Sequence, residues 1–162
     1  MTVAPTSARF NRAEWSSAFR NVDEELTDVP LKPVRGEVPD ALRGSLYRNG
    51  PGRLERDGQR VHHPFDGDGM ITVLHFDAEG VRCSNRFVRT SGWKAEEAAG
   101  KVLFRGVFGS QKPGGPLANA FDLRLKNIAN TGVVRLGDDL LALWEAAEPH
   151  ALDPQTLETR GL

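Results

Sequence analysis

Glycine and proline divide this chain into short segments, and they constrain its fold more than any other feature. The chain has 17 glycines and 10 prolines among 162 residues, more than an average globular protein contains. Most of them fall between short runs rich in Val, Ile, Leu, Phe and Thr, a pattern typical of strands separated by turns. The sequence therefore predicts an all-β protein with little helix.

Six runs predict strands, and two connections between them predict hairpins. Gly80 in Ala78–Gly80 and Gly137 in Leu136–Asp139 can each adopt the positive φ that a tight hairpin turn requires. Such antiparallel hairpins are typical of a sandwich, a barrel or the blades of a propeller. The six runs are Gly44–Arg48, Met70–Asp77, Val81–Arg89, Ala129–Leu136, Leu140–Glu145 and Ala151–Asp153.

Two further segments depart from the strand pattern. Trp15, Phe19 and Val22 recur at helical spacing, which predicts a short helix within an N-terminal segment, 1–27. We expect a packed cap or docking helix, with a membrane-interface helix as the alternative. Ser91–Leu117 is rich in Gly, Lys, Glu and Pro and predicts a long surface loop.

Charge and cysteine content exclude several classes of protein. The 21 basic and 22 acidic residues give a net charge of −1, which disfavours a nucleic-acid partner. Cys83 is the single cysteine, so the chain can form neither an internal disulfide nor a thiolate zinc site. The longest apolar run, Leu140–Trp144, is too short to span a membrane, and the first residues lack a signal peptide's apolar stretch. These features predict a cytoplasmic protein.

The acidic segment Phe65–Gly69 resembles the start of a calcium-binding loop. A calcium loop would need an oxygen ligand where Met70 stands and a glycine where Ile71 stands. We therefore expect a tight turn in which Asp66 and Asp68 cap backbone amides.

Histidine and glutamate supply the other candidate site residues. The spacing of the histidines does not predict a metal site, because two are adjacent and none form a helical pair. Glu145 follows an apolar run, so we expect it at the end of a buried strand, where a carboxylate must be paired, protonated or set against an imidazole. The alternative is an ordinary solvated glutamate. The four histidines are His62, His63, His75 and His150.

Five segments in order resemble the N-terminal part of the carotenoid cleavage oxygenase family, over residues 28–162. Five ordered motifs are far more specific than any single signal above. The segments are Gly44–Gly52, His63–Met70, Arg86–Thr90, Lys126–Thr131, and Trp144–Glu145 followed by Leu152–Thr159.

This resemblance implies a seven-bladed β-propeller with iron(II) on its axis, held by four histidines. The implied reaction is cleavage of a conjugated double bond of a carotenoid or apocarotenoid by O2, giving carbonyl products. By the same resemblance, Glu145 orients an iron-ligating histidine, Trp144 and Phe65 line the substrate tunnel, and His63 is structural. Pro64 and Gly132 depart from the family pattern, so the resemblance does not specify the substrate.

The resemblance also places every iron ligand beyond Leu162, where the strand pattern stops unfinished. We therefore expect residues 28–162 to be a truncated part of the propeller, and the chain alone to bind no iron and to be inactive. Two alternatives stay open: a non-catalytic binding module derived from the propeller, and a family enzyme that cleaves stilbenoids or phenylpropanoids. Peripheral membrane contact to collect an apolar substrate also stays open.

Overall fold

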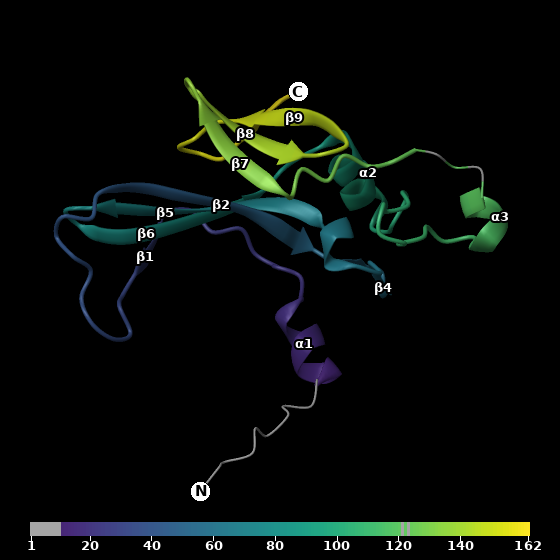
Figure 1. The fold of residues 1–162 in the computed structure, drawn as a ribbon, viewed down its shortest axis with the longest axis horizontal. Coiled ribbons are helices and arrows are strands. Elements are labelled where there is room, and N and C mark those ends of the chain that lie inside the picture. The colour runs from purple at the N-terminus through teal and green to yellow at the C-terminus, as the bar shows by residue number, and fades with distance from the viewer. Residues whose placement is uncertain (1–10, 121, 123) are drawn as a thin grey trace, which may run out of the picture.

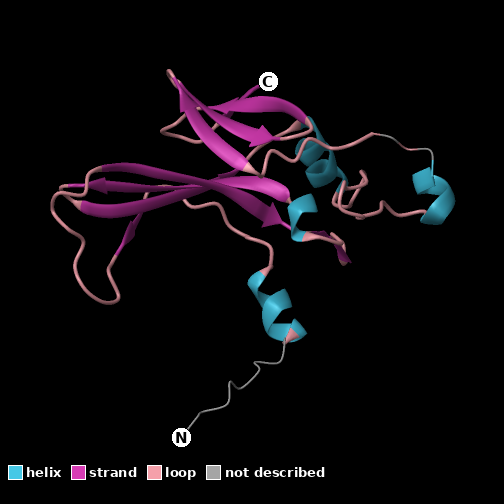
Figure 2. Cartoon of the chain, in the orientation of Figure 1, coloured by secondary structure: helices cyan, strands magenta, loops and turns pink. Residues whose placement is uncertain are grey.

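Two four-stranded antiparallel sheets form the body of the protein, and short helices lie around them (Figures 1 and 2). The computed structural model describes residues 11–120, 122 and 124–162, without the side chains of Arg12 and Trp15. The expectation of a mainly β protein is confirmed. Among the described residues, no helix is both long and apolar enough to span a membrane.

The first sheet has the strand order β1-β6-β5-β2, and the second has the order β10-β9-β8-β7. A small separate hairpin is formed by β3 and β4. The first sheet contains β1 (Val29–Leu31), β2 (Gly44–Arg53), β5 (Asp68–Asp77) and β6 (Gly80–Phe87). The second contains β7 (Gly132–Leu136), β8 (Asp139–Trp144), β9 (Ala147–Leu152) and β10 (Thr159–Gly161), and the small hairpin contains β3 (Glu55–Arg56) and β4 (Gln59–Arg60).

Both predicted hairpins are confirmed. Asp77 pairs with Gly80 at the β5–β6 turn, and Gly80 has a φ of +126°. Leu136 pairs with Asp139 at the β7–β8 turn, where Gly137 has a φ of +59°. Glycine tolerates these positive angles without strain, so local turn chemistry accounts for both connections.

The strands do not begin and end where predicted, most clearly in β2, β7 and β9, the last of which spans Ala147–Leu152 instead of Ala151–Asp153. β2 continues to Arg53 through a proline, which is tolerated because β2 is an edge strand of its sheet. β7 begins at Gly132 instead of Ala129, because the preceding residues cross to the first sheet.

The prediction of a loop over Ser91–Leu117 is wrong at both ends. Helix α2 spans Ser91–Ala99, and α3 spans Gly115–Ala120. The Thr90 side chain caps α2 by accepting from the Trp93 N–H, and Gly100 ends the helix with a left-handed φ of +64°. These are standard helix-capping signals, and an alanine- and glutamate-rich stretch lies between them.

The N-terminal helix is shorter than the predicted apolar face. Helix α1 spans Arg12–Ala18, so Phe19 and Val22 follow it, and the Trp15 side chain lies outside the described residues. Val22 packs against a buried cluster of the first sheet and α2, and its N–H donates to the Gly52 carbonyl. The prediction of one helical face is therefore wrong, and Val22 instead ties this segment to the body of the protein.

The main core lies between the two sheets. Ile71 and Val73 of β5 pack with residues of β8 and β9, all of them almost completely buried. Tyr47 of β2 strengthens the contact, because its hydroxyl donates to the Pro154 carbonyl at 2.8 Å. The cluster consists of Ile71, Val73, Val88, Ala129, Leu140, Ala142, Leu152 and Leu157.

Candidate active site

The segment that leads into β5 crosses the segment that leads into β7. The Gly69 N–H donates to the Ile128 carbonyl at 2.8 Å. A Cβ at Gly69 would lie 2.1 Å from the Ala129 carbonyl oxygen, so the close approach requires glycine. The Asn130 amide donates to the carbonyls of Phe65 and Gly67 at 3.0 and 2.7 Å. These contacts hold the two segments in one fixed arrangement.

Thr131 and Trp144 lie at the same end of the second sheet. Both the N–H and the Oγ1 hydroxyl of Thr131 donate to the Leu143 carbonyl, at 3.1 and 2.9 Å. Trp144 is the last residue of β8 and is 8% exposed. Two neighbouring residues therefore link the two parts of the site: Asn130 bonds to the Phe65 carbonyl, and Thr131 bonds to the end of β8.

Glu145 is exposed in the turn between β8 and β9, where its carboxylate has no hydrogen-bond or ion-pair partner among the described residues. The prediction of a buried strand-end carboxylate is wrong, because the strand ends one residue earlier, at Trp144. An exposed, unpaired carboxylate is free to accept a hydrogen bond.

Phe65 belongs to a cluster of three rings on the surface. It lies in a short 3-10 helix, η1 (Pro64–Asp66), and is 54% exposed. Its ring centroid lies 4.8 Å from that of His63 and 5.7 Å from that of Phe108. Phe108 is 47% exposed and comes from the connection between α2 and α3. Sequence reasoning missed Phe108, because this connection has no periodic pattern.

His63 has a structural role in this arrangement. Its Nδ1 accepts from the Phe65 N–H at 3.1 Å and so caps η1. This role agrees with the structural histidine implied by the family resemblance.

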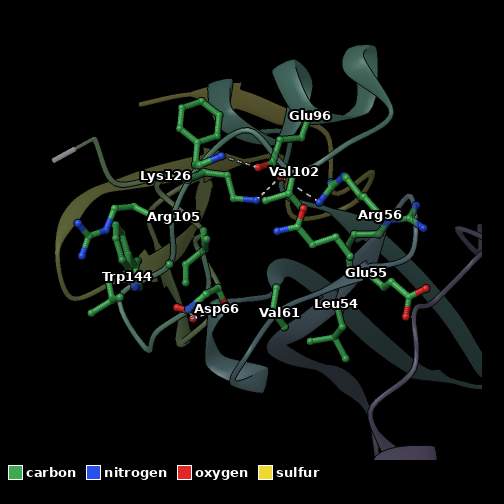
Figure 3. A pocket seen from close by; sticks show the side chains of 17 residues that line it. Leu54, Glu55, Arg56, Val61, Asp66, Glu96, Val102, Arg105, Lys126 and Trp144 are labelled. Carbon is green, nitrogen blue, oxygen red and sulfur yellow. Dashed lines mark hydrogen bonds and ion pairs between the residues drawn. The ribbon is translucent and has the colours of Figure 1, made fainter. Parts of the chain in front are cut away.

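Trp144 is one of the residues that line a small cavity (Figure 3). Its volume is about 30 Å³, room for about two water molecules. Asp66, Lys126 and Trp144 all line it, so the element that carries Phe65 and the end of β8 both contribute to one cavity. The cavity is far too small for a polyene.

The tight turn predicted at Phe65–Gly69 is present, because η1 ends at Asp66 and β5 begins at Asp68, but neither aspartate caps a neighbouring amide as predicted. Asp66 accepts from the N–H groups of Phe108 and Ser110, so it caps a distant loop. Asp68 forms ion pairs with Arg56 and Lys126. Both side chains are at most 4% exposed.

Asp68 belongs to a closed ring of alternating charges, which we call the charge ring: Arg56, Asp68, Lys126 and Glu96. The Arg56 Nη1 lies 2.7 Å from Asp68 and 3.1 Å from Glu96, and the Lys126 Nζ lies 2.7 and 2.6 Å from the same carboxylates. All four side chains are at most 9% exposed. Burial alone would lower the pKa of Arg56, but the adjacent Asp68, together with Glu96 and Glu97, raises it above its usual value. The ring joins β3, β5 and α2 to the start of the 126–131 segment.

The histidines do not form a metal site. Within the described ranges, no three histidine, cysteine, aspartate or glutamate side chains are placed to hold a metal ion. The residues present therefore do not fit the iron that the resemblance implies. His150 is buried in β9, where desolvation, together with the nearby charge of Lys94, lowers its pKa.

The chain matches known proteins along nearly its whole length. The family profile described as retinal pigment epithelial membrane protein matches residues 19–162. Apocarotenoid-15,15'-oxygenase of Synechocystis is 48% identical over 99% of this chain and 33% of its own length. Chloroplastic carotenoid cleavage dioxygenase 7 of Oryza sativa is 37% identical over 91% of this chain and 25% of its own length. Isoeugenol monooxygenase of Pseudomonas nitroreducens is 36% identical over 86% of this chain and 28% of its own length. The chain thus spans about a third or less of these relatives.

Solved structures of the Synechocystis apocarotenoid oxygenase share this fold. They cover 93–94% of this chain and 31–32% of their own, at 48–49% identity and TM-scores of 0.87–0.89. One has a threonine replaced by alanine, another a tryptophan replaced by alanine, and a third has the glutamate after that tryptophan replaced by glutamine. The three substituted residues have the same spacing as Thr131, Trp144 and Glu145. With this match in sequence and fold, the chain is a member of the retinal pigment epithelial membrane protein family, the carotenoid cleavage oxygenases.

Proposed function

We propose that this chain is the N-terminal part of a non-haem iron(II) dioxygenase that cleaves a conjugated double bond of a carotenoid or apocarotenoid with O2. The observation that carries this proposal is the 48% identity to an apocarotenoid oxygenase across nearly the whole chain, including the threonine, tryptophan and glutamate spacing at the site. The products are two carbonyl compounds. The two sheets would be blades of a seven-bladed propeller that residues after Leu162 complete.

The site residues have separable roles in this proposal. Phe65 and Trp144 contact the apolar substrate. Glu145 accepts a hydrogen bond from the ring N–H of a histidine supplied from beyond residue 162, which orients that ring and fixes its tautomer. When bound, the iron supplies oxygen activation, and we assign it no ligand within residues 1–162. The isolated chain would therefore bind no stoichiometric iron and cleave no substrate.

The experiment uses the natural protein at its full length and an apocarotenal with dioxygen. Loss of the polyene absorbance and two carbonyl products by mass spectrometry are expected, and iron chelation abolishes both. Glu145→Gln lowers turnover about 10- to 100-fold, the effect typical of losing a group that orients a metal ligand. Glu148→Gln, another exposed glutamate of the same hairpin, is the matched control and leaves turnover unchanged.

Two outcomes would redirect the assignment. A native protein whose intact mass is the 17.8 kDa of this chain would favour the non-catalytic binding module. Cleavage of isoeugenol or a stilbene, with apocarotenals untouched, would favour the phenylpropanoid enzyme, a candidate supported by the 36% identity to isoeugenol monooxygenase.

A further inference from the structure

The loop 106–110 is wrapped around one buried carboxylate. Asp66 Oδ1 accepts from the Phe108 N–H at 3.0 Å, and Oδ2 accepts from the N–H and Oγ of Ser110 at 3.2 and 2.7 Å. Asp66 is 4% exposed and forms no ion pair with the described cations. A buried carboxylate is costly without hydrogen-bond donors. Moving the loop away would leave the Asp66 charge buried and without these three donors.

The loop backbone is shaped for this carboxylate. A Cβ at Gly106 would lie 2.2 Å from the Cγ of Asp66, so only glycine permits the approach. The Gly106 N–H donates to the Ser110 carbonyl at 2.8 Å, which closes the loop on itself. The Ser110 Oγ also accepts from the His62 N–H at 2.7 Å, which ties the loop to the connection between β4 and η1 at a second point.

This anchored loop carries apolar side chains that are half exposed. Val107 is 50% exposed and Phe108 is 47% exposed, although the backbone N–H of Phe108 is bonded to a buried group. Phe65 directly precedes Asp66, so the same carboxylate sets the positions of both aromatic rings, whose centroids lie 5.7 Å apart. Exposed apolar groups on a rigid polar anchor are typical of a binding surface.

We propose that Asp66 is a positioning residue for substrate binding: it holds Phe108 beside Phe65 so that the two rings form one apolar contact surface for the polyene. The inference rests on the proposed function. Asp66 touches no substrate in this proposal and acts through the Phe108 backbone. Figure 3 shows Asp66 and Trp144 among the side chains that line the cavity.

The test measures KM and kcat for an apocarotenal with the natural protein at full length. Asp66→Asn removes one of the two carboxylate acceptors, and we expect KM to rise about tenfold, or about 1.4 kcal/mol of binding free energy, with kcat within about twofold. Phe108→Leu should likewise raise KM and leave kcat within about twofold. Because Asp66 acts through Phe108, the double variant should be no worse than the poorer single variant. Asp138→Asn, in an exposed turn, is the matched control.

The outcomes separate this inference from the proposed function. Additive effects of Asp66→Asn and Phe108→Leu, or a fall in kcat with KM unchanged, would overturn the positioning role. Should Asp66→Asn fail to fold, Ser110→Ala removes one donor and is expected to raise KM about threefold. Binding of the apocarotenal can be measured without turnover, by the quenching of tryptophan fluorescence. If the wild type cleaves nothing but both variants weaken this binding, the proposed function fails and the positioning role stands.

Discussion

Glu96→Gln is the sharpest test of the charge ring, because it removes one charge and almost no volume. Glu96 is 1% exposed, and its Oε1 accepts from the N–H groups of Leu103 and Phe104. Its Oε2 accepts from Arg56 and Lys126. The glutamine oxygen can keep the first pair of bonds, but its NH2 group then faces two cations and can accept from neither.

The expected cost follows from the two lost bonds. Each hydrogen bond to a charged group contributes about 1.5–3 kcal/mol, so two contribute about 3–6 kcal/mol. Removing one partner of a buried ion pair costs about 3–5 kcal/mol, because it leaves an uncompensated charge. The ring changes from neutral to a net charge of +1, and we expect a loss of about 3–5 kcal/mol in the free energy of unfolding.

Urea unfolding of the natural protein at full length, followed by tryptophan fluorescence, measures this loss as a lower midpoint at an unchanged m value. Glu97→Gln is the matched control, since the next residue of α2 is 34% exposed, contacts the same Arg56, and should cost less than about 1 kcal/mol. Adding Lys126→Met to Glu96→Gln restores neutrality, so the double variant should lose less than the sum of the singles. Equal costs for Glu96→Gln and Glu97→Gln would refute the argument.

Two further predictions concern packing and pH. Gly69→Ala should sharply lower the melting temperature, because its Cβ would overlap the Ala129 carbonyl. Gly50→Ala is the control and should leave the melting temperature nearly unchanged, because a Cβ there would meet open space. Equal effects of the two substitutions would contradict the close crossing at Gly69. The pKa of His150 is lower in the folded protein than its usual value near 6.5, so stability is complete above pH 6.5 and falls as the pH drops toward the folded pKa. Urea midpoints at pH 7.5 and 5.5 should differ less in His150→Gln than in the wild type; an unchanged difference would rule His150 out as the cause.

Local features of the sequence predicted the parts of the fold that depend on neighbouring residues. Gly80 and Gly137 marked the hairpins, because tight turns between strands commonly place a glycine with positive φ in the turn or directly after it. The family resemblance identified the Trp144–Glu145 pair, whose match is supported by spacing. Helix α2 was missed although its capping residues, Thr90 and Gly100, are visible in the sequence.

Tertiary structure alone decided the roles of Asp66, Asp68 and Glu145. Asp66 and Asp68 are separated by a single residue, yet one holds a loop 42 residues away and the other closes the charge ring. Glu145 looked buried because it follows an apolar run, and it is exposed because the strand ends one residue earlier. The partner of a buried charge comes from whichever distant segment the fold brings within about 3 Å, and spacing along the chain carries no record of that distance.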